Sequence, residues 1–150
     1  MQAINPLAQI PTLVLPDGSV MTESAAITLW LAEQSASGDL VPEPNAPERA
    51  RFLRWLIFIT SNIYPTYTYA DDPARFVSHK TARAGFLDTV NQYAKKLYGI
   101  LNAEASSPWF LGDRFSALDI YVCALTHWRP KRPWFEANTP NLIAIADATT

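Results

Sequence analysis

The sequence has little of several features that mark particular classes of protein. It has one cysteine in 150 residues, so no internal disulfide can form and we expect a reducing, cytoplasmic setting. No apolar run approaches about 18 residues, and no basic stretch leads into an apolar core near the N-terminus, so we expect neither a membrane span nor a signal peptide. The formal net charge of −2 lacks the basic excess that drives nucleic-acid binding.

Apolar residues, by contrast, are plentiful. They make up 49% of the chain against 17% charged residues, which is enough for a core in one globular unit or two small ones. No His, Cys and carboxylate residues stand together at the spacing that metal ligands need, so we expect no metal site.

The stretch over residues 10–31 is the most informative. Thr12 to Leu15 is a short run of β-branched and apolar residues, Pro16-Asp17-Gly18 is typical of a turn, and Ser19 to Met21 is a second short strand. The periodicity then changes to helical spacing, with apolar residues at Ala26, Ile27, Trp30 and Leu31. Thr22, Glu23 and Ser24 stand where this helix, ending near Gln34, would start.

The rest of the chain predicts helices. A Pro-rich segment over 35–47 precedes a helix from Glu48 to about Ile63, and residues 64–69 are interpreted as the C-terminal half of a helix that Pro65 kinks. Further helices are expected over 78–103, 117–127 and 141–147. We expect one face of the helix that begins at Glu48 to be buried, with Phe52, Trp55, Leu56, Ile59 and Ile63 on it. We also expect one face of the helix over 78–103 to be buried, with Phe86, Leu87, Val90, Tyr93, Ala94, Leu97 and Leu101 on it. The nearly all-apolar third helix should be buried on every side, including Cys123, and residues 128–134 should form a basic loop.

Two of these patterns carry a resemblance to a known family. The run Asn5 to Leu13 with the Pro-Asp-Gly turn and Thr22 to Ile27, followed much later by a Ser116/Asp119 capping box, resembles cytosolic glutathione S-transferases. The resemblance implies an α+β, mostly α fold. A partial thioredoxin-like domain of a β-hairpin plus a helix (1–37) would be followed by a linker (38–47) and an all-helical domain (48–150).

The resemblance also implies a site. The backbone of Ile10, before a cis Pro11, would pair with the cysteinyl part of glutathione, and Glu23 and Ser24 would hold its γ-glutamyl group at a helix N-terminus. Asn62, Tyr64 and Tyr67 are candidates for the wall of a pocket for a hydrophobic electrophile, although partly buried aromatics are also common without ligands. Glutathione would be a co-substrate, with no further cofactor, and the protein a homodimer.

In the family, the catalytic Tyr, Ser or Cys lies in a strand–helix–strand unit before this point. We therefore expect no catalytic residue in this chain, and poor conjugation of glutathione by the chain alone. Two other functions stay open, a non-catalytic module for protein assembly and a glutathione-dependent thiol reductase. The transferase class also stays open, because residues 57 and 62–65 depart from the bacterial beta-class pattern.

Overall fold

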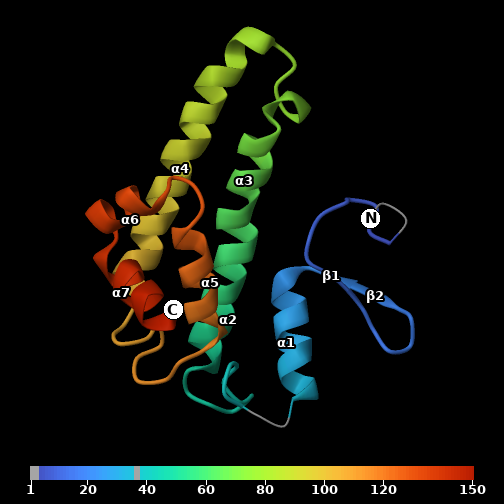
Figure 1. Ribbon diagram of the computed structural model, residues 1–150, viewed down its shortest axis with the longest axis vertical. Coiled ribbons are helices and arrows are strands. Elements are labelled where there is room, and N and C mark those ends of the chain that lie inside the picture. Colours follow the sequence, from blue (N-terminus) through green and yellow to red (C-terminus); the bar gives the residue numbers. More distant parts are fainter. Residues whose placement is uncertain (1–3, 36–37) are drawn as a thin grey trace.

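The computed structural model describes residues 4–35 and 38–150, and it consists of a small lobe beside a larger helical body (Figure 1). The small lobe holds the strands β1 (Thr12–Val14) and β2 (Val20–Thr22) and the helix α1 (Ser24–Gln34). The body holds all the other helices. The predicted α+β, mostly α fold is confirmed. The end of the predicted first domain, at residues 36–37, lies outside the described residues.

The hairpin has the turn that its sequence predicts. Strands β1 and β2 are antiparallel, with Thr12 opposite Thr22 and Val14 opposite Val20. At the tip, Gly18 has a φ of 85°, a conformation that glycine adopts without a steric penalty. The Asp17 carboxylate accepts hydrogen bonds from the backbone N–H and the hydroxyl of Ser19, which lower the pKa of Asp17.

A long helical rod forms the centre of the body. It runs through α2 (Arg49–Phe58), a π-helical turn η1 (Ile59–Ile63) and α3 (Tyr64–Asp71), so residues 64–69 continue the helix as interpreted from the sequence. Within the turn, the N–H of Tyr64 donates to the carbonyl of Ile59, five residues back. Pro65 has no N–H to donate and its ring crowds the preceding turn. This explains why the hydrogen bonds shift here from a spacing of four residues to one of five.

The remaining helices pack around this rod. Two short 3₁₀ turns, η2 (Pro73–Arg75) and η3 (Lys80–Ala82), lead into α4 (Arg83–Glu104), which runs beside α3 (Figure 1). The helices α5 (Ala117–Thr126), α6 (Arg132–Asn138) and α7 (Pro140–Thr149) complete the body. Part of the predicted basic loop is therefore helical. Arg132 at the start of α6 is held by Glu136 and Asp147, so its charge is used within the fold.

The core lies between the rod, α4, α5 and α7. The predicted buried face of the rod is confirmed, since its five members are all fully buried. On α4 the prediction is wrong for Tyr93, which is 49% exposed, because the buried positions Val90, Leu97 and Leu101 follow intervals of seven and four and Tyr93 stands to one side of that line. Three other members of the predicted face are only half-buried: Phe86, Leu87 and Ala94. On α5 the prediction is wrong for Ile120, which is exposed, and for Cys123, which is half-buried.

A buried carboxylate fixes the start of α5. Ser116 and Asp119 form a capping box, in which an Asp119 oxygen accepts from the N–H of Ser116 at 2.7 Å. The other oxygen accepts from the N–H of Phe110, also at 2.7 Å. Burial raises the pKa of Asp119, and these hydrogen bonds act in the opposite direction. This carboxylate therefore joins the start of α5 to the segment before it.

Candidate functional site

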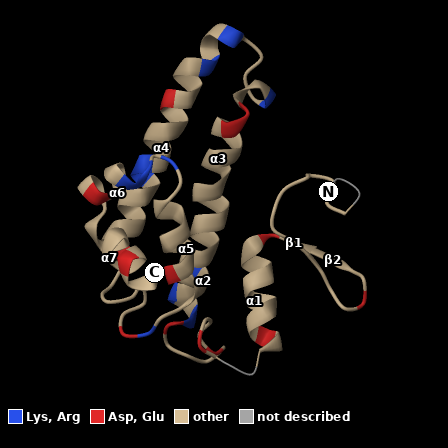
Figure 2. Ribbon diagram, in the orientation of Figure 1, with Lys and Arg blue, Asp and Glu red and all other residues tan. Residues whose placement is uncertain are grey.

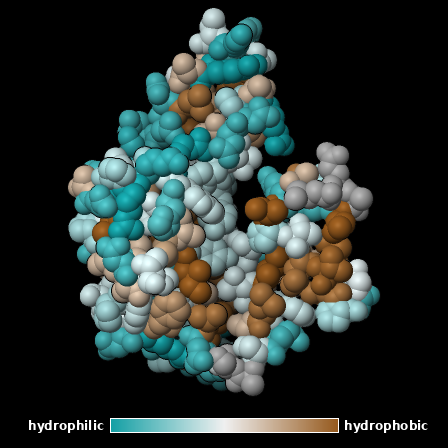
Figure 3. All heavy atoms as spheres, in the orientation of Figure 1, coloured by the Kyte–Doolittle hydropathy of each residue, from teal (hydrophilic) through white to brown (hydrophobic). Residues whose placement is uncertain are grey.

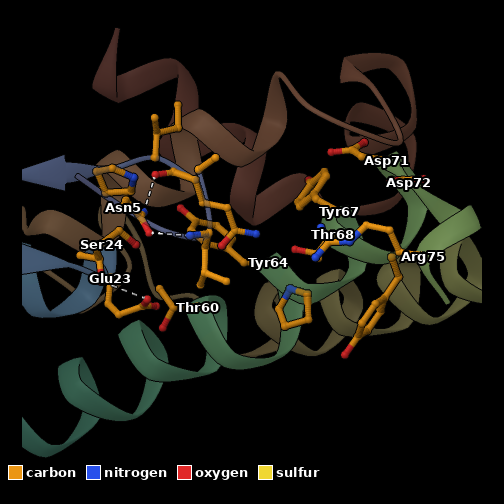
Figure 4. Close-up of a pocket in the computed structure, with 18 of the residues that line it drawn as sticks. Asn5, Glu23, Ser24, Thr60, Tyr64, Tyr67, Thr68, Asp71, Asp72 and Arg75 are labelled. Atoms are coloured by element: carbon orange, nitrogen blue, oxygen red, sulfur yellow. Dashed lines mark hydrogen bonds between the residues drawn. The ribbon is translucent and has the colours of Figure 1, made fainter. Parts of the chain in front are cut away.

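A cleft of about 1030 Å³ lies between the small lobe and the body. One side is made by the loop over residues 5–11 and the start of α1, and the other by η1, α3 and the segment after α3. In Figure 4, Asn5, Glu23, Ser24 and Thr60 lie at one end, with Tyr67, Thr68, Asp71, Asp72 and Arg75 at the other. The volume is at the upper end of the range for small-molecule sites.

The loop before β1 is shaped by Asn5. This side chain is almost fully buried, and its amide donates to the carbonyl of Gln9 at 2.9 Å and to the hydroxyl of Thr12 at 3.2 Å. Its oxygen accepts from the N–H of Leu7. The loop thereby presents Ile10, which is 80% exposed, and Pro11 to the cleft, and the bond between them is cis.

The start of α1 faces the same end of the cleft. Glu23 precedes the helix with a φ of 69°, a left-handed conformation that costs a non-glycine residue about 1–3 kcal/mol. Ser24 is the first helical residue, and the N–H groups of a first helical turn have no partner within their own helix. Strained backbone is kept where the surrounding structure demands it, and such positions concentrate at binding sites.

The opposite wall is one face of the central rod. Thr60, Tyr64, Tyr67 and Thr68 follow each other at intervals of four, three and one residues, so their side chains point to the same side of the helix. Asn62 is not among the lining residues, because it stands two positions away from Thr60 and from Tyr64 around the helix. Its amide donates instead to the hydroxyl of Ser61.

Tyr64 lies on the body side of the cleft. The centre of its ring is 6.2 Å from that of Tyr121 and 5.8 Å from that of Trp128. Burial raises the pKa of Tyr64, so the hydroxyl keeps its proton at neutral pH. A hydrogen bond joins the small lobe to the body beside this residue, since the hydroxyls of Thr28 on α1 and Tyr121 on α5 lie 3.1 Å apart.

Tyr67 contributes its ring more than its hydroxyl. The hydroxyl donates to the carbonyl of Arg129 at 3.0 Å and is also hydrogen-bonded to Tyr98 on α4, so it is occupied within the body. Burial raises the pKa of Tyr67 as well. The ring meets Trp128 edge to face at 5.3 Å, and both residues line the cleft. This part of the wall is therefore aromatic and apolar.

The cleft has binding groups but little acid–base chemistry. No cysteine or histidine is found among its described lining residues, and Cys123 on α5 is not one of them. Over residues 4–35 and 38–150, no cluster of three or more His, Cys, Asp or Glu side chains is placed to hold a metal ion. Within the same ranges, no helix combines the length and the apolar content that spanning a membrane requires.

Six residues singled out in the sequence meet in the cleft: Ile10, Pro11, Glu23, Ser24, Tyr64 and Tyr67. The capping residues Ser116 and Asp119 lie elsewhere, in the core. Asn5, Thr60, Thr68 and Trp128 also line the cleft and were not among the predicted site residues. Thr60 and Thr68 could have been found, because they share a helical face with Tyr64, whereas the position of Trp128 depends on tertiary packing.

Comparisons with known proteins agree with this geometry. Residues 1–34 match the family model of the glutathione S-transferase N-terminal domain. The GST-like protein YncG of Escherichia coli K12 is 38% identical over 149 residues, which cover 99% of this chain and 71% of YncG. The glutathione S-transferase GstA of Escherichia coli O157:H7 is 31% identical over 127 residues, which cover 84% of this chain and 60% of GstA.

A solved structure gives the same result at the level of the fold. It is a sphingomonad glutathione S-transferase in complex with glutathione, with a TM-score of 0.64 and 26% identity. The match covers 99% of this chain and 71% of that one. The chain thus spans between 60% and 71% of the length of these proteins. With the helix start at Ser24, the Ser116/Asp119 box and this similarity to YncG, the chain belongs to the glutathione S-transferase family.

Proposed function

We propose that this chain binds glutathione at the small-lobe end of the cleft and serves the conjugation of glutathione to hydrophobic electrophiles. The observation that carries the proposal is the convergence of Ile10, Pro11, Glu23 and Ser24 on one end of a cleft whose other wall is aromatic. Two molecules that must react with each other need adjoining subsites of this kind.

The small-lobe end has groups suited to each part of the γ-glutamyl moiety. The hydroxyl of Ser24 and the free N–H groups of the first turn of α1 would bind its carboxylate, helped by the helix dipole. The Glu23 carboxylate, which lines the cleft, would pair with its ammonium group. The backbone of Ile10, exposed before the cis bond, would pair with the cysteinyl amide.

The opposite wall would hold the electrophile. Tyr64, Tyr67 and Trp128 offer ring surface, and Thr60 and Thr68 offer hydroxyls. The cleft chemistry described above favours binding over activation, because a thiolate is stabilised by a cation or by directed hydrogen-bond donors close to the sulfur. We therefore expect the 150-residue chain to bind glutathione and to conjugate it slowly.

Glutathione titration followed by calorimetry tests this proposal. We expect millimolar or tighter binding by the 150-residue chain, with S-methylglutathione binding similarly because the contacts above do not use the thiol. Ser24→Ala should weaken binding about tenfold, since a hydrogen bond to a charged group is worth about 1.5–3 kcal/mol. Ser61→Ala is the matched control, because Ser61 lies on the adjacent helix outside the cleft and donates to the carbonyl of Ile57.

Absence of binding at 20 mM glutathione, on the order of the weakest useful affinity, would contradict the proposal. Equal affinities for the wild type and Ser24→Ala would also contradict the assignment of the carboxylate. Binding with no conjugation of any electrophile, in any longer form of the protein, would favour the assembly module over the enzyme.

We further propose that the protein forms at least a dimer through the small lobe. Over the described residues the sheet has two strands, so the outer edge of β1 carries unpaired backbone N–H and C=O groups. Apolar side chains gather over the hairpin and α1 (Figure 3), with Val14 55% exposed, and few charges interrupt them (Figure 2). An apolar edge of this kind is a template for pairing with another chain.

Light scattering at tens of micromolar should therefore give at least the mass of a dimer. Val14→Lys should shift the protein toward the monomer, because a charge on the edge opposes strand pairing. Ile100→Lys, at an exposed apolar position on α4, is the control and should leave the mass unchanged. A monomeric wild type, with slow amide exchange over 12–14, would show that this edge is covered within one chain.

A further inference from the structure

The outer end of the cleft, away from the small lobe, combines two exposed rings with a cation. Tyr69 at the end of α3 and Phe76 after η2 are 40% and 46% exposed, and their rings meet edge to face at 5.0 Å. The guanidinium carbon of Arg75 lies 5.8 Å from the centre of the Phe76 ring. All three residues line the cleft. Adjacent exposed rings beside a cavity are a feature of ligand sites more than of ordinary surface.

The cation at this end is available to a ligand. Arg75 is the one positively charged residue among the described residues that line the cleft, and it forms no ion pair within the described part of the chain. Asp71, on the same wall, is already paired with Arg129, at 2.6 Å between Oδ1 and Nη2. Asp72 is also a lining residue, so the two charges here that are open to a ligand are those of Arg75 and Asp72.

The contact with Phe76 distinguishes Arg75 from Asp72. A flat molecule stacked on one of these two perpendicular rings would meet the other ring and would place its edge next to the guanidinium, which offers five N–H donors in a planar fork. A carboxylate or sulfonate on that edge could bind both arms of the fork. The ring pair of Tyr69 and Phe76 and the cation thus select the same kind of ligand, one with a ring and an anionic group.

The cleft is long enough to hold such a ligand beside glutathione. Its helical wall runs from Thr60 to Asp71, and at about 1.5 Å per residue this is about 16 Å. Figure 4 shows Glu23, Ser24 and Thr60 at one end of this length and Thr68 and Arg75 at the other. The proposed glutathione contacts occupy the first end only, so the second end is open to the partner in the reaction.

We propose that the outer half of the cleft binds aromatic molecules that carry a carboxylate or sulfonate, with the ring packed against the Tyr69 and Phe76 pair and the anion on Arg75. This inference rests on the proposed function for one point only, namely that the molecule bound there is the electrophile. Arg75 then sets the substrate class, separating acidic aromatic electrophiles from neutral ones.

Two fluorescent probes with the same ring system test the proposal without glutathione. 8-Anilinonaphthalene-1-sulfonate carries the anion, and N-phenyl-1-naphthylamine lacks it. We expect the wild type to bind the sulfonate about three- to tenfold more tightly than the neutral probe, with the preference reduced at high salt. Arg75→Gln should remove the preference, and Arg75→Lys should retain part of it.

Three further variants make the result specific. Arg83→Gln removes a nearby cation outside the cleft, whose Nε donates to the carbonyl of Val77, and should leave the preference intact. Phe76→Ala should weaken both probes, because each loses the ring surface. Asp72→Asn should tighten the sulfonate, since a neighbouring negative charge is removed.

Equal binding of the two probes by the wild type, or a preference that survives in Arg75→Gln, would overturn the proposal. The glutathione titration with Ser24→Ala is a separate experiment at the other end of the cleft. If glutathione fails to bind while the Arg75-dependent preference holds, the transferase proposal is wrong and the aromatic-anion site remains. If glutathione binds but the probe preference does not depend on Arg75, the proposed substrate class is wrong and the transferase proposal stands.

Discussion

The buried carboxylate of Asp119 allows a quantitative test of what holds the helical body together. Asp119 is 0% exposed, and its oxygens accept from the N–H groups of Phe110 and Ser116 and from the hydroxyl of Ser116. Asp119→Ala would leave two backbone N–H groups buried without an acceptor. Each such orphan costs about 1–3 kcal/mol, so we expect a loss of about 3–5 kcal/mol in the free energy of unfolding.

Conservative variants separate the hydrogen bonds from the volume of the side chain. Asp119→Asn keeps the shape, but its NH₂ group replaces an acceptor and would face one of the two N–H donors, so a loss of about 2–3 kcal/mol is expected. Ser116→Ala removes only the hydroxyl and should cost about 1 kcal/mol. Asp113→Ala is the control, because Asp113 is exposed nearby, and should lie within about 0.5 kcal/mol of the wild type.

The measurement is urea unfolding followed by tryptophan fluorescence, since the chain has five tryptophans. A domain of ordinary stability has about 5–15 kcal/mol in total, so at the lower end of that range Asp119→Ala would be barely folded. A loss below about 1 kcal/mol in Asp119→Ala would refute the reasoning, because the two N–H groups would then have found other acceptors.

Two further predictions concern pH and an orphaned donor. The raised pKa of Asp119 means that the folded state holds this proton more tightly than the unfolded state, so the stability that Asp119 contributes is present below its ordinary value of 3.8 and falls as the pH rises through its folded pKa. The stability difference between the wild type and Asp119→Asn should therefore be larger at pH 4 than at pH 7, and a difference independent of pH would refute this. Trp55 is 1% exposed and its Nε1 has no hydrogen-bond partner in the described structure. Trp55→Phe removes that donor while opening a small cavity, so urea unfolding should give a change within about 1 kcal/mol, and a loss above 3 kcal/mol would refute it.

Most of the helices and strands could be predicted from the local sequence alone. The Pro16-Asp17-Gly18 turn needs a glycine at positive φ, and the buried face of α2 needs only helical spacing, so both were predictable from neighbouring residues. The helix through residues 64–69 was also predictable, but with a kink at Pro65 in place of the π-helical turn that the structure has. Here a π-helical turn stands directly before Pro65, which has no N–H to donate, and its residues Ile59 and Ile63 are buried in the core.

The small-lobe end of the cleft was more predictable from the sequence than the outer end. Ser24 and Pro11 lie within a short stretch, so their proximity follows from a hairpin and a helix. The outer end is different, because Trp128 and Arg75 reach the cleft only through the packing of α5 and the turn after α3. The same limit applies to α6, where the ion pairs of Arg132 with Glu136 and Asp147 stabilise a helix that the prolines in the sequence predict as a loop.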